Sequence, residues 1–225
     1  MSEKLIVTED GSHTLYLEDL GEHYHSTHGA IQESQHVFIE SGLRQAISKK
    51  APIKVLEVGF GTGLNALLTL SEAVSSKKKI QYVSIEPYPL KEEIYKNLNY
   101  GKLIEMKDAD TYFQKMHQCN WNFPFYFTDY FILNKINSKL EDAQFQPEAF
   151  DLVFFDAFAP GKQPEVWSEE NFAKIFAAMN PGGILTTYSS QGQVKRTLIA
   201  AGFEIEKIPG PKGKREILRA IKPMV

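Results

Sequence analysis

The fold of this 225-residue chain is decided by one stretch, Val55-Leu56-Glu57-Val58-Gly59-Phe60-Gly61-Thr62-Gly63-Leu64-Asn65. An apolar run that predicts a strand leads into three closely spaced glycines, and a helical pattern over 64–70 follows directly. Glycine lets the backbone turn sharply and approach a ligand closely, and the free N–H groups at a helix N-terminus attract negative charge. The stretch therefore predicts a strand–turn–helix unit that binds a ligand at its turn.

Short apolar runs alternate with helical patterns along most of the remaining chain. Because nearly every position of each run is apolar, we expect an α/β fold with a parallel sheet covered by helices on both faces. Only a short loop rich in proline and glycine joins the last two runs, so they are expected to pair antiparallel. The expected strands are Ile53–Val58, Ile80–Ile85, Phe150–Phe155, 184–188, 203–208 and Glu216–Ile221, and the expected helices are 31–48, 64–70, 90–98, 108–118, 168–179 and 191–201.

Two smaller features are expected outside this alternating pattern. Two β-prone runs at 5–8 and 14–18 flank an Asp-Gly pair, which predicts a hairpin near the start of the chain. A second, aromatic hairpin is expected over 123–133. We therefore expect a core domain at 51–225 and an N-terminal extension at 1–50, made of a hairpin and a helix, packed on that core.

Composition and charge exclude several classes of protein. Hydrophobic residues make up 43% of the chain, charged residues 24% and the net charge is −3, which is ordinary for a globular protein and unlike a disordered one. The single cysteine, Cys119, excludes a disulfide framework and a cysteine-rich zinc module. No metal is expected at His23, His25 and His28, because no convincing cluster of carboxylates or cysteines accompanies them. No apolar run could span a membrane and no signal-peptide pattern opens the sequence, so the cytoplasm is the expected location.

Two acidic residues bear on which ligand the glycine turn binds. The run 61–66 fits the dinucleotide pattern G-x-G-x-x-G/A, which leaves NAD as an alternative cofactor. Glu57 lies two residues before the first glycine, where a carboxylate favours an ammonium group over a pyrophosphate. Glu86 ends the next apolar run, 23 positions after Gly63, where an acidic side chain can accept hydrogen bonds from ribose hydroxyls.

Asp156 is the strongest candidate for a catalytic side chain. It directly follows the most hydrophobic run of the chain, so we expect it at the carboxyl edge of the sheet, where α/β proteins bind their ligands. A carboxylate there can hold or deprotonate an attacking amine, and the aromatic, proline-containing loop after it can wall the pocket. The alternative interpretation is an aspartate that only caps a helix.

Four segments of the chain resemble class I S-adenosylmethionine-dependent methyltransferases. The resemblance is closer to the methyltransferase half of the bacterial bifunctional enzymes that complete 5-methylaminomethyl-2-thiouridine at the tRNA wobble position, and it covers most of residues 20–221. It implies a Rossmann-like class I methyltransferase fold and S-adenosyl-L-methionine as the cofactor. The segments are Glu33-Ser34-Gln35-His36-Val37-Phe38, 56–65, 155–167 and Lys212-Gly213-Lys214-Arg215-Glu216.

The resemblance also implies which residues form the site. Asp156 would lie beside the transferred methyl group as the catalytic carboxylate. Asn134 stands where the family often carries Gly-Asp near the adenine, and its carbonyl oxygen can still accept from an amino group. The residues expected at the cofactor are Glu57, Gly59, Phe60, Gly61, Gly63, Asn65, Glu86, Asn134 and Asp156, and those expected at the substrate are Phe158, Lys162, Lys212, Lys214 and Arg215.

The function implied is N-methylation of 5-aminomethyl-2-thiouridine in tRNA, by an enzyme expected to stand alone without an oxidase half. Residues 195–225 carry a net charge of +5, which agrees with a polyanionic partner such as tRNA, although charge alone favours a solvated basic face. Three alternatives stay open at this point. They are a methyltransferase of the same fold that acts on a small amine or a protein, an NAD-dependent oxidoreductase, and a nucleotide-binding protein without catalysis.

Overall fold

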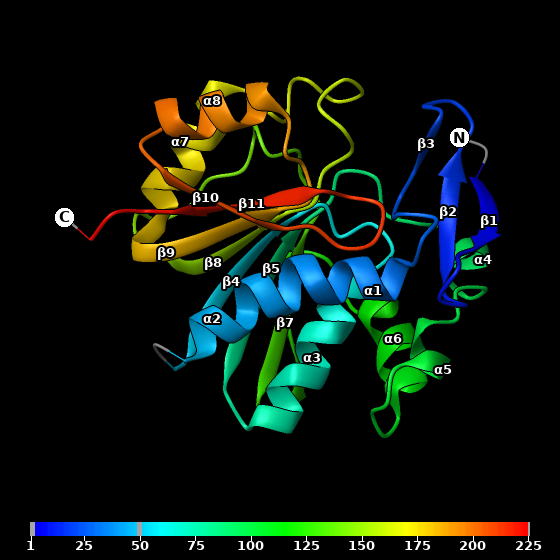
Figure 1. The fold of residues 1–225 in the computed structure, drawn as a ribbon. Coiled ribbons are helices and arrows are strands. Elements are labelled where there is room, and N and C mark those ends of the chain that lie inside the picture. The colour runs from blue at the N-terminus through cyan, green and yellow to red at the C-terminus, as the bar shows by residue number, and fades with distance from the viewer. Residues whose placement is uncertain (1–2, 49–50, 225) are drawn as a thin grey trace.

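A sheet of eight strands lies between two layers of helices, and a smaller sheet of three strands stands beside one end of it (Figure 1). The computed structural model describes residues 3–48 and 51–224. The strands are β1 (Glu3–Val7), β2 (His13–Leu17), β3 (Glu22–His23), β4 (Ile53–Val58), β5 (Ile80–Ile85), β6 (Pro124–Thr128), β7 (Phe131–Ile136), β8 (Phe150–Phe155), β9 (Met179–Thr187), β10 (Glu204–Pro209) and β11 (Glu216–Ile221). The helices are α1 (Ala30–Ser34), η1 (Gln35–Leu43), α2 (Arg44–Ile47), α3 (Leu64–Ser76), α4 (Glu92–Tyr95), α5 (Tyr100–Leu103), α6 (Ala109–Gln118), α7 (Glu169–Ala178) and α8 (Gly192–Ala200).

The large sheet has the order β10-β11-β9-β8-β4-β5-β7-β6. Its five central strands run parallel, while β6 pairs antiparallel with β7 and β11 pairs antiparallel with both β9 and β10. The α/β fold predicted from the sequence, with a parallel centre and antiparallel last strands, is therefore confirmed. The hairpin expected over 123–133 is also present, as β6 and β7.

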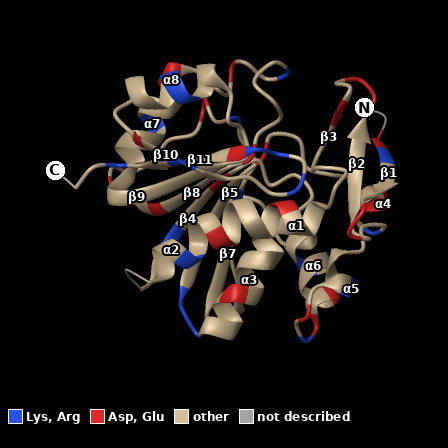
Figure 2. Ribbon diagram, in the orientation of Figure 1, with Lys and Arg blue, Asp and Glu red and all other residues tan. Residues whose placement is uncertain are grey.

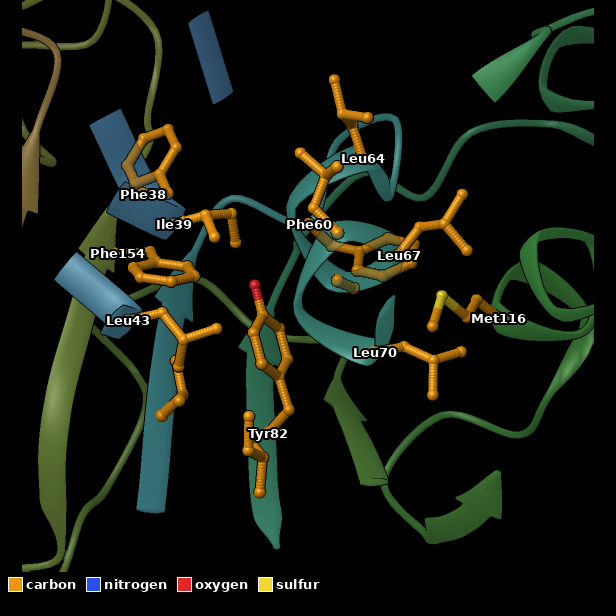
Figure 3. Close-up of a cluster of buried hydrophobic side chains, with 14 of the residues drawn as sticks. Phe38, Ile39, Leu43, Phe60, Leu64, Leu67, Leu70, Tyr82, Met116 and Phe154 are labelled. Atoms are coloured by element: carbon orange, nitrogen blue, oxygen red, sulfur yellow. The ribbon is translucent and has the colours of Figure 1, made fainter. Parts of the chain in front are cut away.

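Side chains alternate between the two faces of the sheet and supply two hydrophobic clusters. On β4, Val55 joins the cluster under α3 and α6, and the next residue, Leu56, joins the cluster under α7 and α8. Figure 3 shows part of the first cluster, where Phe38 of η1 lies beside Phe154 of β8 with 5.2 Å between ring centroids. Burial on both faces explains why the central strands are almost wholly apolar.

The helix expected over 31–48 is one continuous element whose middle, η1, is π-helical. Ser41 Oγ donates to the carbonyl oxygen of His36, five residues earlier, which satisfies an acceptor within this wider turn. The helix packs directly into the first cluster of the main sheet. The domain boundary expected at residue 50 falls on positions 49 and 50, which lie outside the described residues. The division into two domains therefore stays a prediction.

Two elements differ from the sequence-based expectation. The helix expected over 90–98 is limited to α4, and the chain after it is held instead by the N-terminal hairpin, since Asn99 Oδ1 accepts from the N–H of His13. Strand β9 begins at Met179 and not at 184. The Pro-Gly-Gly sequence at 181–183 lies inside this strand. It shifts the register of pairing with β8 but does not interrupt the strand.

One close approach between β4 and β8 positions the carboxyl edge of the sheet. Gly59, directly after β4, has φ +94°, and a Cβ added there would lie 2.8 Å from the carbonyl oxygen of Asp156. The backbone N–H of Asp156 in turn donates to Val58 O at 3.0 Å. Only glycine allows this contact without strain, so it fixes Asp156 beside the glycine turn.

We predict that Gly59→Ala lowers the free energy of unfolding by about 2 kcal/mol or more, because the methyl group meets backbone and alanine disfavours positive φ. Denaturant unfolding measures this change. Gly161→Ala is the control, since a Cβ there has no atom within 4 Å, and it should shift stability by less than about 0.5 kcal/mol. Equal effects of the two substitutions would contradict the role given to Gly59.

Candidate active site

A cavity of about 800 Å³ opens at the carboxyl ends of β4, β5 and β8. Its floor is the turn after β4, one side is the loop after β8, and the opposite side is the N-terminal segment around β3. This volume lies near the upper end of the range of about 300–1,000 Å³ that is usual for small-molecule sites. The cavity is therefore large enough for a cofactor and part of a second molecule.

Glu86 is fixed at the end of β5 by the backbone around it. Its Oε2 accepts from the N–H of Gly61 at 3.0 Å, and its Oε1 accepts from the N–H of Tyr88 at 2.8 Å. Burial nevertheless raises the pKa of this carboxyl above its usual range. Each carboxylate oxygen has a second lone pair, so Glu86, which lines the cavity, can still accept hydrogen bonds from a ligand.

Asp156 lies in the cavity wall, next to Asn65 at the start of α3. Asn65 Nδ2 donates to Asp156 Oδ2 at 2.8 Å, which orients the carboxylate. Burial of the carboxyl group raises the pKa of Asp156 to about 7, and the Asn65 hydrogen bond opposes that rise. At neutral pH this group therefore both releases and binds a proton readily, which is the property that a general base needs.

Glu57 does not line the cavity, contrary to the sequence-based expectation that it faces a ligand's ammonium group. It shares one face of β4 with Val55, so its side chain points under α3, where it is fully buried. Ser84 Oγ donates to Glu57 Oε2 at 2.5 Å, and burial raises the pKa of Glu57 to about 8. The carboxyl group is thus held inside the sheet by β5 and does not face the cavity.

The other predicted residues divide into two groups. Asn134 lies inside β7, two residues before the strand ends, so it does not reach the carboxyl edge as expected. Gly63 packs under Phe60 and His117. The predicted residues that line the cavity are Gly59, Phe60, Gly61, Asn65, Glu86, Asp156, Phe158, Lys162 and Lys214, and those that do not are Glu57, Gly63, Asn134, Lys212 and Arg215.

The N-terminal segment closes the cavity, which sequence reasoning missed. Lys162 Nζ donates to the carbonyl oxygen of Leu20 at 2.7 Å, and the rings of Tyr24 and Phe158 meet edge to face at 4.9 Å. His25 also lines the cavity, and burial lowers its pKa to about 4, so it is neutral at pH 7. No pattern in the sequence places this polar loop opposite a strand end 130 residues later.

Two lysines expected to hold phosphates are engaged with carboxylates instead. Lys214 Nζ lies 2.5 Å from Glu33 Oε1 in the cavity wall, and Lys212 Nζ lies 2.6 Å from Glu9 Oε2 outside it. Figure 2 shows the basic loop between β10 and β11 close to the acidic residue of α1. The positive charge of this end of the chain is therefore partly neutralised.

Two further properties follow from the described residues, 3–48 and 51–224. No group of three or more His, Cys, Asp or Glu side chains among them is arranged to hold a metal ion. His28 pairs with Glu9, and His23 lies against the ring of Tyr16, so these two histidines have other neighbours. No helix within the same ranges has the length and apolar character to cross a membrane.

A family model and two solved structures match this chain. A family model described as S-adenosyl-L-methionine-dependent methyltransferase matches residues 108–223. The crystal structure of MnmC2 from Aquifex aeolicus is similar with a TM-score of 0.77 and 27% identity, over 99% of this chain and 70% of that one. Spermidine synthase from Thermotoga maritima, at a TM-score of 0.57 and 10% identity over 100% of this chain and 72% of that one, shares the fold.

Curated relatives are longer than this chain. The tRNA 5-methylaminomethyl-2-thiouridine biosynthesis bifunctional protein MnmC of Pseudomonas savastanoi pv. phaseolicola is 30% identical over 211 residues, which are 89% of this chain and 32% of that protein. The protein of the same name from Actinobacillus pleuropneumoniae is 28% identical over 230 residues, with shares of 95% and 34%. The chain thus spans about a third of the length of these relatives.

We predict that Glu57→Gln makes the stability of the protein less sensitive to a rise in pH between 4.5 and about 8. The folded-state pKa of Glu57 is raised from 4.5 to about 8, so the folded protein keeps a proton that the unfolded chain releases. Stability must therefore fall as the pH rises through this window, with a limiting slope of about 1.4 kcal/mol per pH unit. Glutamine cannot ionise and lacks this loss.

Thermal unfolding of both proteins between pH 5 and pH 9 measures the effect. The difference between the melting temperature of Glu57→Gln and that of the parent should grow in favour of the variant as the pH rises. Glu105→Gln removes an exposed carboxylate and is the control. Parallel pH dependences of Glu57→Gln and the parent would show that Glu57 is ionised in the folded protein.

Proposed function

Because this chain belongs to the S-adenosyl-L-methionine-dependent methyltransferase family, we propose that it transfers the methyl group of that cofactor to an amine in tRNA. The acceptor we propose is the primary amine of 5-aminomethyl-2-thiouridine at the wobble position, which becomes methylaminomethyl. Family membership also decides between the two cofactors that the sequence left open, in favour of S-adenosyl-L-methionine over NAD.

The observation that carries the proposal is the Asp156 carboxyl, with a pKa of about 7, in the same cavity as the glycine turn. An alkylamine is mostly protonated at neutral pH and must lose its proton before it can act as a nucleophile. A carboxylate poised near pH 7 suits that task. The named activity of the related MnmC proteins, biosynthesis of 5-methylaminomethyl-2-thiouridine in tRNA, supports the choice of acceptor.

The cavity fits the cofactor at several points. Gly59 and Gly61 have no side chains, so their backbone lines the floor of the cavity directly. We propose that Glu86 accepts hydrogen bonds from the ribose hydroxyls. Asn65 Oδ1 is buried without a hydrogen-bond partner among the described residues, so it is free to accept from a ligand's ammonium or water. Asn134 is not proposed as an adenine contact, since it does not reach the cavity.

The chain's own residues supply orientation and proton transfer. When bound, S-adenosyl-L-methionine supplies an electrophilic methyl group on a sulfonium sulfur. Asp156 takes the proton of the substrate ammonium, directly or through one water, and the neutral amine that remains can then attack the methyl group. Asn65 holds the carboxylate in place, while the rings of Tyr24 and Phe158 form an aromatic part of the cavity wall.

We predict that Asp156→Asn lowers the single-turnover rate of tRNA methylation by about 10²-fold or more, because an amide cannot take the proton. In the parent protein the rate should rise with pH through about 7, as Asp156 ionises. The melting temperature and cofactor affinity of the variant should stay near those of the parent.

Rapid-quench assays with radiolabelled cofactor measure this rate. Asp129→Asn, in the exposed turn between β6 and β7, is the control for the same chemical change. A variant at Asp156 that methylates within a few-fold of the parent would reduce Asp156 to a structural group.

A second candidate function has one observation in its favour. Among the described residues, the cavity is lined by seven carboxylates, Asp19, Glu22, Glu33, Glu86, Glu141, Asp156 and Glu165, against three lysines, Lys139, Lys162 and Lys214. Such a negative cavity attracts a small cationic amine as well as the aminomethyl group of a nucleoside. The two functions differ in whether a surface outside the cavity binds phosphates.

We predict that replacing Lys212 and Arg215 together by alanine weakens tRNA binding. Both are exposed beside the cavity, and the Lys212–Glu9 ion pair is weak enough to exchange for a phosphate contact. The slope of log affinity against log salt should fall by up to about 0.9 for each phosphate that the variant no longer neutralises.

Filter binding or fluorescence anisotropy at several salt concentrations measures that slope. Lys78 and Lys79, exposed between α3 and β5, are the matched pair for a control double variant. An unchanged slope for the first variant would place the tRNA surface elsewhere, and turnover of a small amine without tRNA binding would favour the second function.

A further inference from the structure

An ion pair in the cavity wall joins two of the segments that the sequence analysis singled out. Lys214, in the loop between β10 and β11, pairs with Glu33 of α1, although 181 residues separate them. Glu33 Oε2 also accepts from the backbone N–H of Ser26 at 2.7 Å, so the carboxylate is held at both oxygens. Neither residue has a part in the mechanism given above.

This pair differs from the neighbouring pair, which joins Lys212 of the same loop to Glu9 in the turn between β1 and β2. The Glu33 side chain is 9% exposed and that of Lys214 is 31% exposed, whereas Glu9 and Lys212 are 50% and 61% exposed. Only the first pair lines the cavity. A half-buried pair that faces a ligand cavity is placed for recognition, while the exposed pair contributes little.

A chain of contacts links the pair to Ala157, the residue after Asp156. Lys214 Nζ lies 4.2 Å from the centre of the Tyr188 ring, and Tyr188 donates its hydroxyl hydrogen to the carbonyl oxygen of Ala157 at 2.9 Å. Ala157 directly follows Asp156. The charges are also coupled, because Glu33 raises the pKa of Asp156 and Lys214 lowers it. Glu33, Lys214 and Asp156 line the same cavity, so a molecule that places an amine at Asp156 can also contact this pair.

Both side chains keep hydrogen-bonding capacity for such a molecule. A lysine ammonium has three N–H donors, of which one is used by Glu33. A carboxylate has about four acceptor positions, and Lys214 and Ser26 use two of those on Glu33. The wall therefore presents a donor beside an acceptor, and the pair as a whole carries no net charge.

We propose that Lys214 and Glu33 read the edge of the acceptor base, Lys214 donating to its C4 carbonyl oxygen and Glu33 accepting from its N3–H. The proposal deepens the proposed function and rests on it. In a 5-aminomethyluridine the C4 carbonyl is the neighbour of the carbon that bears the aminomethyl group, and N3–H follows. The donor and acceptor of the pair match this order.

A cytosine presents the opposite order, with an amino donor at C4 and an acceptor at N3. It would set its amino group against the Lys214 ammonium and its N3 lone pair against the Glu33 carboxylate. Unpaired polar groups in a closed site are costly, so the pair selects uracil-type bases over cytosine-type bases. The sulfur at C2 plays no part in this selection.

The test compares two anticodon stem-loop RNAs, one with 5-aminomethyluridine and one with 5-aminomethylcytidine at the wobble position. The quantity measured is the ratio of kcat/KM for the two RNAs. The parent protein should favour the uridine by about 100-fold or more. Glu33→Gln, which keeps an acceptor for Ser26, and Lys214→Met should each reduce the ratio by about 10-fold or more.

Two control variants break ion pairs outside the cavity. Glu9→Gln removes the partner of Lys212, and Lys207→Met removes the partner of Glu216. Both should keep the parent ratio. Calorimetry with S-adenosyl-L-methionine and thermal unfolding check that each variant is folded and binds cofactor.

The possible outcomes distinguish failure of the base-reading role from failure of the proposed tRNA methylation. A parent protein that methylates the uridine RNA but shows no preference over cytidine overturns the base-reading role alone. The same holds if Glu33→Gln and Lys214→Met are active and keep the parent ratio. A parent that binds the cofactor and methylates neither these RNAs nor the same stem-loop with 5-aminomethyl-2-thiouridine overturns the proposed function, and the base-reading role with it.

Discussion

The close approach of β4 to β8 at Gly59 and Asp156 is the constraint on which the site depends. A side chain at position 59 would strike the Asp156 carbonyl oxygen at 2.8 Å, so the two strand ends can meet only because this residue is glycine. The contact sets the glycine turn, Glu86 and the Asp156 carboxyl around one cavity. The apolar strands behind it, buried on both faces, make the edge rigid enough to hold that geometry.

Three carboxyl groups at or just behind this edge, those of Glu57, Glu86 and Asp156, have pKa values that burial raises. Glu86 and Asp156 are partly compensated by N–H donors, while Glu57 has one oxygen without a partner among the described residues. Because the folded-state pKa is raised, burying these acids costs stability as the pH rises above their ordinary values of 3.8 to 4.5. For Glu86 and Asp156, which line the cavity, this cost falls at the site where a ligand binds, as is usual for functional groups.

Local sequence patterns predicted the sheet and its ligand edge, because apolar runs, glycine turns and strand-end acids act over short distances. They failed where a role depends on the direction in which a side chain points or on contacts between segments far apart in the sequence. Glu57 points under α3 by the alternation of β4, and Asn134 lies too deep in β7. The approach of Glu33 to Lys214, and the closure of the cavity by Tyr24, depend on how distant segments fold together.

The central claim is that the cavity brings a tRNA amine to a sulfonium methyl group beside Asp156. The most direct test is mass spectrometry of nucleosides from tRNA carrying 5-aminomethyl-2-thiouridine, after incubation with this protein and S-adenosyl-L-methionine bearing a deuterated methyl group. The account predicts that the label appears in 5-methylaminomethyl-2-thiouridine and in no other nucleoside. Label in a different nucleoside, or only in a small amine added as a competitor, would contradict it.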